Sequence, residues 1–259
     1  MPGPHFQTAW RTIDTAGDPH RFVRYMDAAR PDEAVMLPLY RRLTRLLELG
    51  APGHVLEVGC ATGGTARELA RLLAPHWRVT AIDKSRTMVA ESRRRCHGLG
   101  LPVGYYVGDA DALPFTDASF DGCYALGIFE ILAHPQRAIA EMVRVLRPGA
   151  RLAIVAGDQL AGHSRQADGE SSAGAFSGAS KTSDHHIAGQ LSAAFHGCAL
   201  LDVAVSRQSL PLPEYALLYQ LWSEDHLASL ANDADTPADQ RTWNHLPPTT
   251  VHVVSGRRA

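Results

Sequence analysis

The chain has 259 residues, and its 25 Lys and Arg side chains nearly balance 27 Asp and Glu, for a formal net charge of −2. This length suits one large α/β domain with a substantial core and is short for two enzyme domains of comparable size. No run of Lys or Arg is long enough to follow a phosphate backbone, which argues against a nucleic-acid substrate.

Residues 1–14 lack the basic start and apolar centre of a signal peptide, and no segment resembles a membrane span. The cysteines contain no C-x-x-C pair, so we expect small buried residues in a reduced compartment without disulfides: Cys60, Cys96, Cys123 and Cys198. The sequence therefore predicts a cytoplasmic protein that does not act at a membrane.

Residues 21–50 carry two helical patterns, the second at 38–50 with apolar positions at helical spacing and a glycine stop. We expect these helices to pack on the rest of the domain as a cap. Tyr25 and Met26 are candidates for ligand contacts, although packing of an amphipathic helix is the better interpretation of both.

The next part of the chain alternates between strands and helices. Strands are expected at residues 55–58, 78–82, 103–107, 120–125 and 151–156. Helices are expected at 84–96, with Met88 and Val89 facing inward, and at 138–146, ended by Pro148 and Gly149. This order predicts an α/β fold with a doubly wound parallel sheet, whose ligand loops lie at the carboxyl ends of the strands.

The carboxyl-terminal third departs from this alternation. Residues 200–207 and 250–257 read as two further strands that close the sheet, with an amphipathic helix at 214–231 between them. Residues 164–184 are rich in Ser, Gly and Ala, which predicts a mobile loop. A lid over the ligands and a slack surface connection both remain open for this loop.

The strand at 55–58 runs into a glycine-rich turn formed by Gly59, Gly63 and Gly64, and Thr65 then opens a helix, as in nucleotide-cofactor loops. A dinucleotide fold would show G-x-G-x-x-G with a pyrophosphate on the helix start, but here the middle glycine is Ala61. Glu57 would repel a pyrophosphate and attract the amino and sulfonium groups of S-adenosylmethionine. An NAD-dependent oxidoreductase is therefore the less favoured alternative.

This segment resembles the first motif, E-x-G-x-G-x-G, of class I S-adenosylmethionine-dependent methyltransferases, with Glu57, Gly59, Ala61 and Gly63 at its key positions. The resemblance implies S-adenosylmethionine as cofactor and a mostly parallel, seven-stranded Rossmann-like sheet with an N-terminal helical cap. Ala61 and, at the turn into the fifth strand, Ala150 replace glycines of the family pattern. Both alanines are tolerated if their φ angles are negative.

Asp83 follows Gly59 by 24 residues and ends the second strand, where a carboxylate can accept hydrogen bonds from both ribose hydroxyls of an adenosine. Residues 108–121, GDADALPFTDASFD, resemble a signature of small-molecule methyltransferases typified by the ubiquinone and menaquinone biosynthesis enzymes. In that resemblance Asp109 and the backbone of Ala110 recognise the adenine edge, and Asp121 opens the fourth strand. The implied cofactor-binding residues are Glu57, Gly59, Ala61, Gly63, Asp83, Lys84, Met88, Asp109, Ala110, Asp111, Ala125 and Leu126.

Methyl transfer from a sulfonium has an activated leaving group, so holding nucleophile and methyl in line does most of the work and a general base is optional. His134, in the loop after the fourth strand, is the candidate base. We expect no metal site at Asp184, His185 and His186, because adjacent residues rarely point at one centre and no H-E-x-x-H motif or cysteine partner accompanies them.

The sequence thus predicts an S-adenosylmethionine-dependent methyltransferase acting on a small molecule, such as a secondary metabolite or quinone-like precursor. The alternative is a methyltransferase-like scaffold that binds the cofactor but catalyses a non-methylating step such as cyclisation. A single domain over 1–259 is expected, with a helical cap (1–50), a cofactor-binding core (51–157), a mobile loop and helix (158–199), and closing strands with an inserted helix (200–259). The acceptor, the attacking atom and the oligomeric state stay open.

Overall fold

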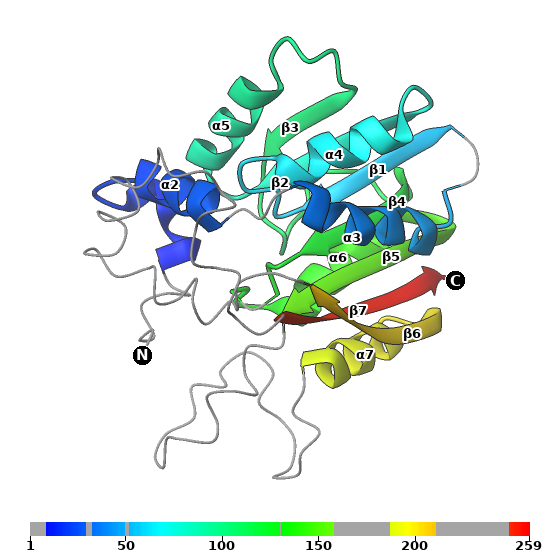
Figure 1. Cartoon of the computed structure of the whole chain (residues 1–259). Coiled ribbons are helices and arrows are strands. Elements are labelled where there is room, and N and C mark those ends of the chain that lie inside the picture. Colours follow the sequence, from blue (N-terminus) through cyan, green and yellow to red (C-terminus); the bar gives the residue numbers. More distant parts are fainter. Residues whose placement is uncertain (1–8, 30–32, 50–51, 130, 158–186, 211–248) are drawn as a thin grey trace, which may run out of the picture.

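The structure is a computed structural model that describes residues 9–29, 33–49, 52–129, 131–157, 187–210 and 249–259 (Figure 1). Its described residues form one seven-stranded sheet in the order β3-β2-β1-β4-β5-β7-β6. The strands are β1 (Gly53–Val58), β2 (Trp77–Asp83), β3 (Val103–Val107), β4 (Phe120–Leu126), β5 (Leu146–Gly157), β6 (Leu200–Leu210) and β7 (Thr249–Arg258). The predicted α/β class and seven-stranded sheet are confirmed.

Strands β1 to β5 pair in parallel, whereas β7 runs antiparallel to both β5 and β6. The strand order reverses on either side of β1, which pairs with β2 on one side and β4 on the other. In open α/β sheets a ligand binds at such a switch point, outside the carboxyl ends of the strands. The topology therefore places a candidate site around the turn after β1.

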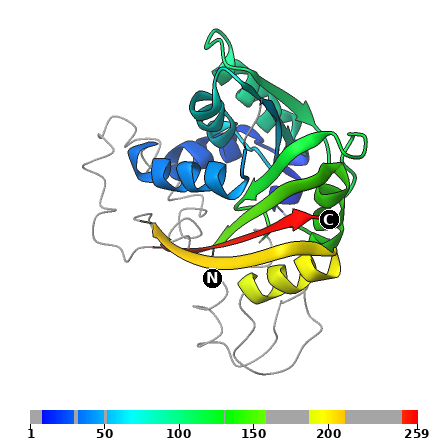
Figure 2. The ribbon, with the colours of Figure 1, turned by 90° about the vertical axis from the view of Figure 1, so that its right-hand side faces the viewer.

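Helices cover both faces of the sheet, as the two views show (Figures 1 and 2). The helices are α2 (His20–Ala29), α3 (Glu33–Leu46), α4 (Gly64–Leu73), α5 (Arg86–Cys96), α6 (Pro135–Val145) and α7 (Ile187–Gly197), and a 3-10 turn η1 (Ile13–Thr15) precedes them. Helices α3 and α4 contact each other, and so do α6 and α7. The sheet is thus the middle of three layers.

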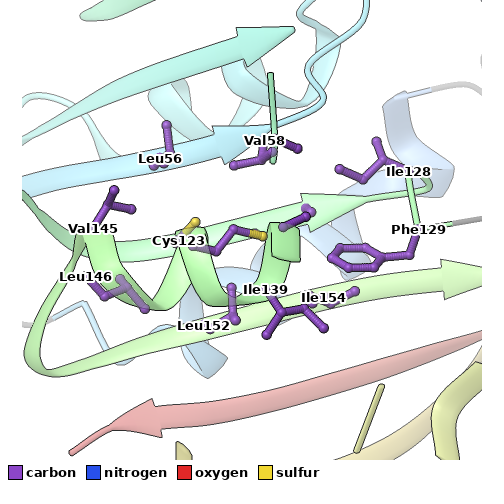
Figure 3. Close-up of a cluster of buried hydrophobic side chains, with 14 of the residues drawn as sticks. Leu56, Val58, Cys123, Ile128, Phe129, Ile139, Val145, Leu146, Leu152 and Ile154 are labelled. Atoms are coloured by element: carbon purple, nitrogen blue, oxygen red, sulfur yellow. The ribbon is translucent and has the colours of Figure 1, made fainter. Parts of the chain in front are cut away.

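Successive side chains of β1 point to opposite faces of the sheet, so this strand contributes to two hydrophobic clusters. Leu56 and Val58 pack with α6 residues such as Ile139 in the cluster shown in Figure 3. Val55, on the opposite face, packs in a second cluster with Leu43 of α3. Removing a large side chain from either cluster, as in Ile139→Ala, is expected to cost about 2–5 kcal/mol of stability.

Two helix boundaries differ from the sequence prediction. Helix α3 begins at Glu33 and contains Pro38, which the sequence pattern placed at the helix start; burial of Met36 holds this extra first turn against the domain. Helix α6 begins at Pro135, a favoured first helical position, and ends at Val145, before Pro148. Strand β5 begins directly at Leu146, so neither Pro148 nor Gly149 ends the helix.

The cysteines are free, and the expectation that all are buried holds only for Cys60 and Cys123, since Cys96 and Cys198 are partly exposed. Both partly exposed cysteines lie near helix ends, where less of the side chain is covered. Met88 and Val89 face inward as predicted, with at most 1% of their surface exposed. The predicted loop at 164–184 and helix at 214–231 lie outside the described residues.

Candidate active site at the carboxyl edge of the sheet

The turn after β1 is held against the neighbouring strand β2 by backbone hydrogen bonds. The amides of Gly59 and Cys60 both donate to the carbonyl of Ile82, at 2.8 and 3.0 Å. Gly59 and Gly63 have φ angles of +80° and +73°, and a Cβ added to Gly63 would lie 2.6 Å from Cε1 of Tyr105. Glycine is needed at 63 for both the backbone conformation and this close approach.

Ala61, between these glycines, also adopts a left-handed conformation, with φ +45°, so it does not meet the condition of a negative φ under which alanine is tolerated without strain. Both of its backbone groups are fixed from outside the turn. The Ala61 amide donates to Oδ2 of Asp83 at 2.8 Å, and its carbonyl accepts from Oγ of Ser92 at 2.7 Å. These bonds offset the roughly 1–2 kcal/mol that an L-residue loses in this conformation.

Ala150 does not share this conformation. The preceding Gly149 takes the left-handed position, with φ +82°, and Ala150 continues within β5. The replacement of the second glycine is therefore accommodated as the sequence analysis anticipated.

Asp83 connects the turn to the start of α5. Besides the Ala61 amide, its carboxylate accepts a hydrogen bond at Oδ1 from the amide of Ser85, at 2.9 Å. Burial raises the pKa of Asp83, and these amide bonds oppose the rise. Each carboxylate oxygen has a further lone pair, so the bonds to the turn are compatible with a second set to ribose hydroxyls.

Glu57 lies beneath the turn with only 2% of its surface exposed. Burial raises the pKa of Glu57 to about 8. The hydroxyl of Tyr124 lies beside the carboxyl group and opposes part of this rise, without reaching regular hydrogen-bond geometry. Within the described residues Oε2 of Glu57 has no hydrogen-bond partner, which fits a ligand that brings a cationic donor to this turn.

The ends of β2 and β3 bring together the residues predicted to hold the adenine end of a cofactor. Nζ of Lys84 lies 2.8 Å from Oδ2 of Asp109, whose Oδ1 accepts the amide of Asp111 at 3.1 Å. Ala110 is buried in the same turn. Burial, followed by the charge of Asp109, raises the pKa of Asp111. Their contacts with a cofactor stay predictions.

Three predicted cofactor residues lie deeper. Met88 is fully buried and packs with Ile13, Phe22 and Val23. Ala125 is buried at the end of β4, and Leu126 is partly exposed beside it. Contacts of these three residues with a cofactor also stay predictions.

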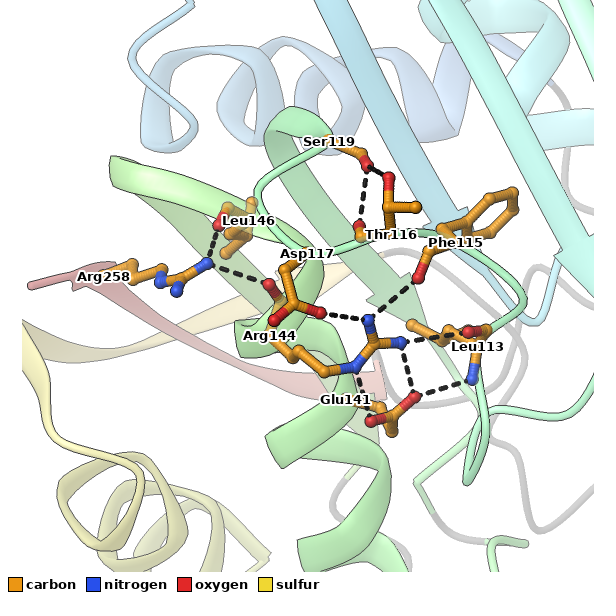
Figure 4. Close-up of polar contacts among 9 residues, drawn as sticks. All are labelled: Leu113, Phe115, Thr116, Asp117, Ser119, Glu141, Arg144, Leu146 and Arg258. Atoms are coloured by element: carbon orange, nitrogen blue, oxygen red, sulfur yellow. Dashed lines mark hydrogen bonds and ion pairs between the residues drawn. The ribbon is translucent and has the colours of Figure 1, made fainter.

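The second half of the 108–121 signature has a structural role. Arg144 of α6 binds Glu141 and Asp117 and donates to the carbonyls of Leu113 and Phe115, at 3.0 and 2.8 Å (Figure 4). This network fixes the segment that connects β3 to β4. Asp121, at the second position of β4, accepts the amide of His54 at 2.8 Å and pairs with Arg147 at the amino edge of the sheet, away from the turn.

His134, the candidate base, is exposed at the N-cap position of α6, where its side chain makes no capping hydrogen bond. Tyr25 is buried, with its ring 5.5 Å from that of Trp10. Met26 packs against the buried cluster that contains Met88 and Phe22. The packing interpretation of Tyr25 and Met26 thus fits the structure. The catalytic role of His134 stays a prediction.

Two residues of the amino-terminal segment contact the site and were missed in the sequence analysis. Arg11 donates to carbonyls of the loop after β4, and Asp14 accepts hydrogen bonds from the start of α5. These contacts join residues 71 to 121 positions apart, so no local pattern marks them.

Among the described residues, no group of three or more His, Cys, Asp or Glu side chains is placed to hold a metal ion. The described helices also include none with the length and apolar character needed to cross a membrane.

Residues 56–154 match a protein family described as a methyltransferase domain. The O-methyltransferase cnsE of Penicillium expansum is 38% identical over 39% of this chain and 37% of its own length. The demethylmenaquinone methyltransferase of Thermus thermophilus is 34% identical over 46% of this chain and 60% of its own length. The matches thus span about a third to three fifths of these relatives.

Solved structures share the fold over more of the chain. The phosphoethanolamine N-methyltransferase 2 of Haemonchus contortus, in complex with S-adenosyl-L-methionine, has a TM-score of 0.62 at 15% identity, over 96% of this chain and 59% of that one. The [4+2]-cyclase SpnF has a TM-score of 0.58 at 22% identity, over 85% of this chain and 80% of that one. At these identities the likeness concerns the fold alone.

Proposed function

We propose that this chain, whose residues 56–154 form a class I S-adenosylmethionine-dependent methyltransferase domain, transfers a methyl group from S-adenosylmethionine to a small molecule. The acceptor class that we propose is a secondary metabolite or quinone-like precursor carrying a hydroxyl, amine or acidic carbon. The O-methyltransferase and the demethylmenaquinone methyltransferase among the relatives support this class.

The observation that carries the proposal is the pair of carboxyl groups on either side of the turn at 59–63. Glu57 lies beneath the turn with an unpartnered oxygen, and Asp83 is bonded to the turn at Ala61. A ligand seated on this turn would bring a cation to Glu57 and a ribose diol to Asp83. We expect the adenine to be held by Asp109, which pairs with Lys84, and by the backbone of Ala110.

The cofactor would supply an activated methyl group on a sulfonium. The protein contributes by holding the acceptor in line with that methyl, which is the larger part of catalysis for such a displacement. The loop after β4 borders this position by topology. In this proposal His134, which is exposed at the end of this loop, would accept a proton from an acceptor hydroxyl.

Binding and product analysis test this proposal. Calorimetric titration with S-adenosylmethionine and S-adenosylhomocysteine should show saturable heat, and both ligands should raise the melting temperature. Incubation with phenolic and hydroquinone acceptors should give products heavier by one methyl group, together with S-adenosylhomocysteine. A folded protein that gives neither heat nor a melting shift would contradict the assignment of the cofactor.

A non-methylating reaction on the same scaffold is the second candidate function. The [4+2]-cyclase SpnF has the same fold, so the fold by itself is compatible with either reaction. Product mass separates the two, because cyclisation leaves the mass of the substrate unchanged and consumes no S-adenosylmethionine. Replacing S-adenosylmethionine by S-adenosylhomocysteine would abolish methyl transfer but leave a cyclisation intact.

A further inference from the structure

Arg11 holds the loop that follows β4. Its Nε donates to the carbonyl of Ile131 at 2.6 Å, and its Nη2 donates to the carbonyl of Leu132 at 3.0 Å. A guanidinium that binds two successive carbonyls fixes the direction as well as the position of this loop. The loop ends at His134 and borders the place assigned to the acceptor.

Asp14 holds the opposite side of the site. Its Oδ2 accepts the amide of Arg86 at 2.7 Å, and its Oδ1 accepts the Ser85 hydroxyl at 2.8 Å and the Thr87 amide at 3.1 Å. A carboxylate at a helix start also interacts favourably with the helix dipole. Asp14 therefore binds the N-cap residue Ser85 and the first turn of α5, which begins three residues beyond Asp83.

The segment between these two residues has to cross the end of β1. In the sheet β1 lies between β2, which leads to the Asp14 contacts, and β4, which leads to the Arg11 contacts. Neighbouring strands are about 4.8 Å apart, so the two contact points are separated by roughly 10 Å with the glycine turn between them. Figure 1 shows α2 and the adjoining amino-terminal segment, in dark blue, beside the edge at which the parallel strands end.

Apolar contacts pack the middle of the segment against α5 and the glycine turn. Ile13 is only 4% exposed and belongs to a cluster with Met88, against which Ala61 of the glycine turn is packed. The methyl group that distinguishes Ala61 from glycine therefore takes part in the contact with the amino-terminal cluster.

We propose that residues 11–14 form a clasp over the glycine turn, which has to release before the cofactor enters or leaves, with Arg11 and Asp14 as its positioning residues. This inference rests on the proposed function, because it takes the turn at 59–63 to be the cofactor site. The clasp joins the cofactor side of the site to the acceptor loop through one short segment. Opening either end exposes the turn, so both association and dissociation of the cofactor are limited by the same event.

Rate measurements with S-adenosylhomocysteine on the full chain test the clasp. Asp14→Asn removes one acceptor oxygen at the α5 end, and Arg11→Lys removes the two-pronged contact at the loop. In each variant we expect the association and dissociation rate constants, measured by surface plasmon resonance, to rise together by about tenfold. Loss of one hydrogen bond to a charged group makes opening of the clasp more favourable by about this factor. The dissociation constant should change far less than either rate.

Asp18→Asn is the matched control. Asp18 lies four residues beyond Asp14 and pairs with Arg24, and more than half of each of these two side chains is exposed. Its rate constants should equal those of the unchanged protein. Melting temperatures of all variants establish that each protein is folded before rates are compared.

Three results would overturn the clasp. Unchanged rate constants in both folded variants would show that the segment does not limit access. A faster dissociation with unchanged association would make Arg11 and Asp14 ordinary ligand contacts. Both of these results leave the proposed function intact, whereas absence of S-adenosylhomocysteine binding by the unchanged protein would overturn the proposed function and the clasp with it.

Discussion

Glu57 and Tyr124 are register partners on the adjacent parallel strands β1 and β4, and their buried side chains lie side by side beneath the glycine turn. Burial raises the pKa of Glu57 to about 8 and raises that of the Tyr124 phenol well above its ordinary value. In the ligand-free protein the carboxyl group is therefore protonated at neutral pH. This protonation state links cofactor binding and stability to pH.

Cofactor affinity is expected to rise with pH up to about 8 and to level off above that value. A cationic ligand group favours the Glu57 carboxylate, so binding below this pH requires the loss of a proton. Calorimetry of S-adenosylhomocysteine binding in buffers with different ionisation heats should detect the released proton. Glu57→Gln should bind with no such release, and an equal proton release in this variant would assign the linkage to another group.

The stability of the ligand-free protein should show the opposite trend. The folded-state pKa of Glu57 is raised from 4.5 to about 8, so between these values the folded state holds a proton that the unfolded state has lost. The contribution of Glu57 to stability is therefore fully present below pH 4.5 and decreases as the pH rises toward 8. Urea denaturation across this range should show a weaker decrease for Glu57→Gln than for the unchanged protein.

Asp83→Ala should weaken binding of S-adenosylhomocysteine by about 1.5–3 kcal/mol, the range for hydrogen bonds to a charged group. The same change removes the acceptor of the Ala61 amide, so hydrogen exchange at Ala61 should also become faster. Asp121→Ala is the control, because Asp121 binds the amide of His54 at the amino edge of the sheet. Unchanged cofactor affinity in folded Asp83→Ala would contradict the ribose assignment.

Swapping glycine and alanine is expected to have unequal effects at positions 61 and 63 of the turn. Ala61→Gly relieves the cost of φ +45° but loses a packed methyl group, so stability should change by less than about 1 kcal/mol and cofactor binding should persist. Gly63→Ala combines φ +73° with a contact to Tyr105 that is too close, and should destabilise the protein by more than 1–2 kcal/mol. Thermal and urea unfolding of the two variants would measure the difference, and equal effects would contradict the strain argument.

Much of the fold could be predicted from local patterns. Apolar runs marked each strand of the sheet, and their alternation with helices predicted a doubly wound arrangement, because strands linked by helices pair in parallel. The spacing of Gly59, Gly63 and Asp83 placed the candidate site at the carboxyl ends of β1 and β2, next to the point where the strand order reverses. Sequence patterning failed at helix starts such as Glu33, where burial of Met36 outweighs the preference of Pro38 for a first turn.

The sequence by itself determined which residue types meet at the carboxyl edge of the sheet, since strands linked by helices pair in parallel and therefore end at the same edge. Only the tertiary structure decided the φ of Ala61, which depends on the hydrogen bond that its amide donates to Asp83 and the one that its carbonyl accepts from Ser92. It also decided the protonation of Glu57, because desolvation depends on neighbours from other strands. The contacts of Arg11 and Asp14 join distant segments, and pairings of this kind arise from three-dimensional packing rather than from any period in the sequence.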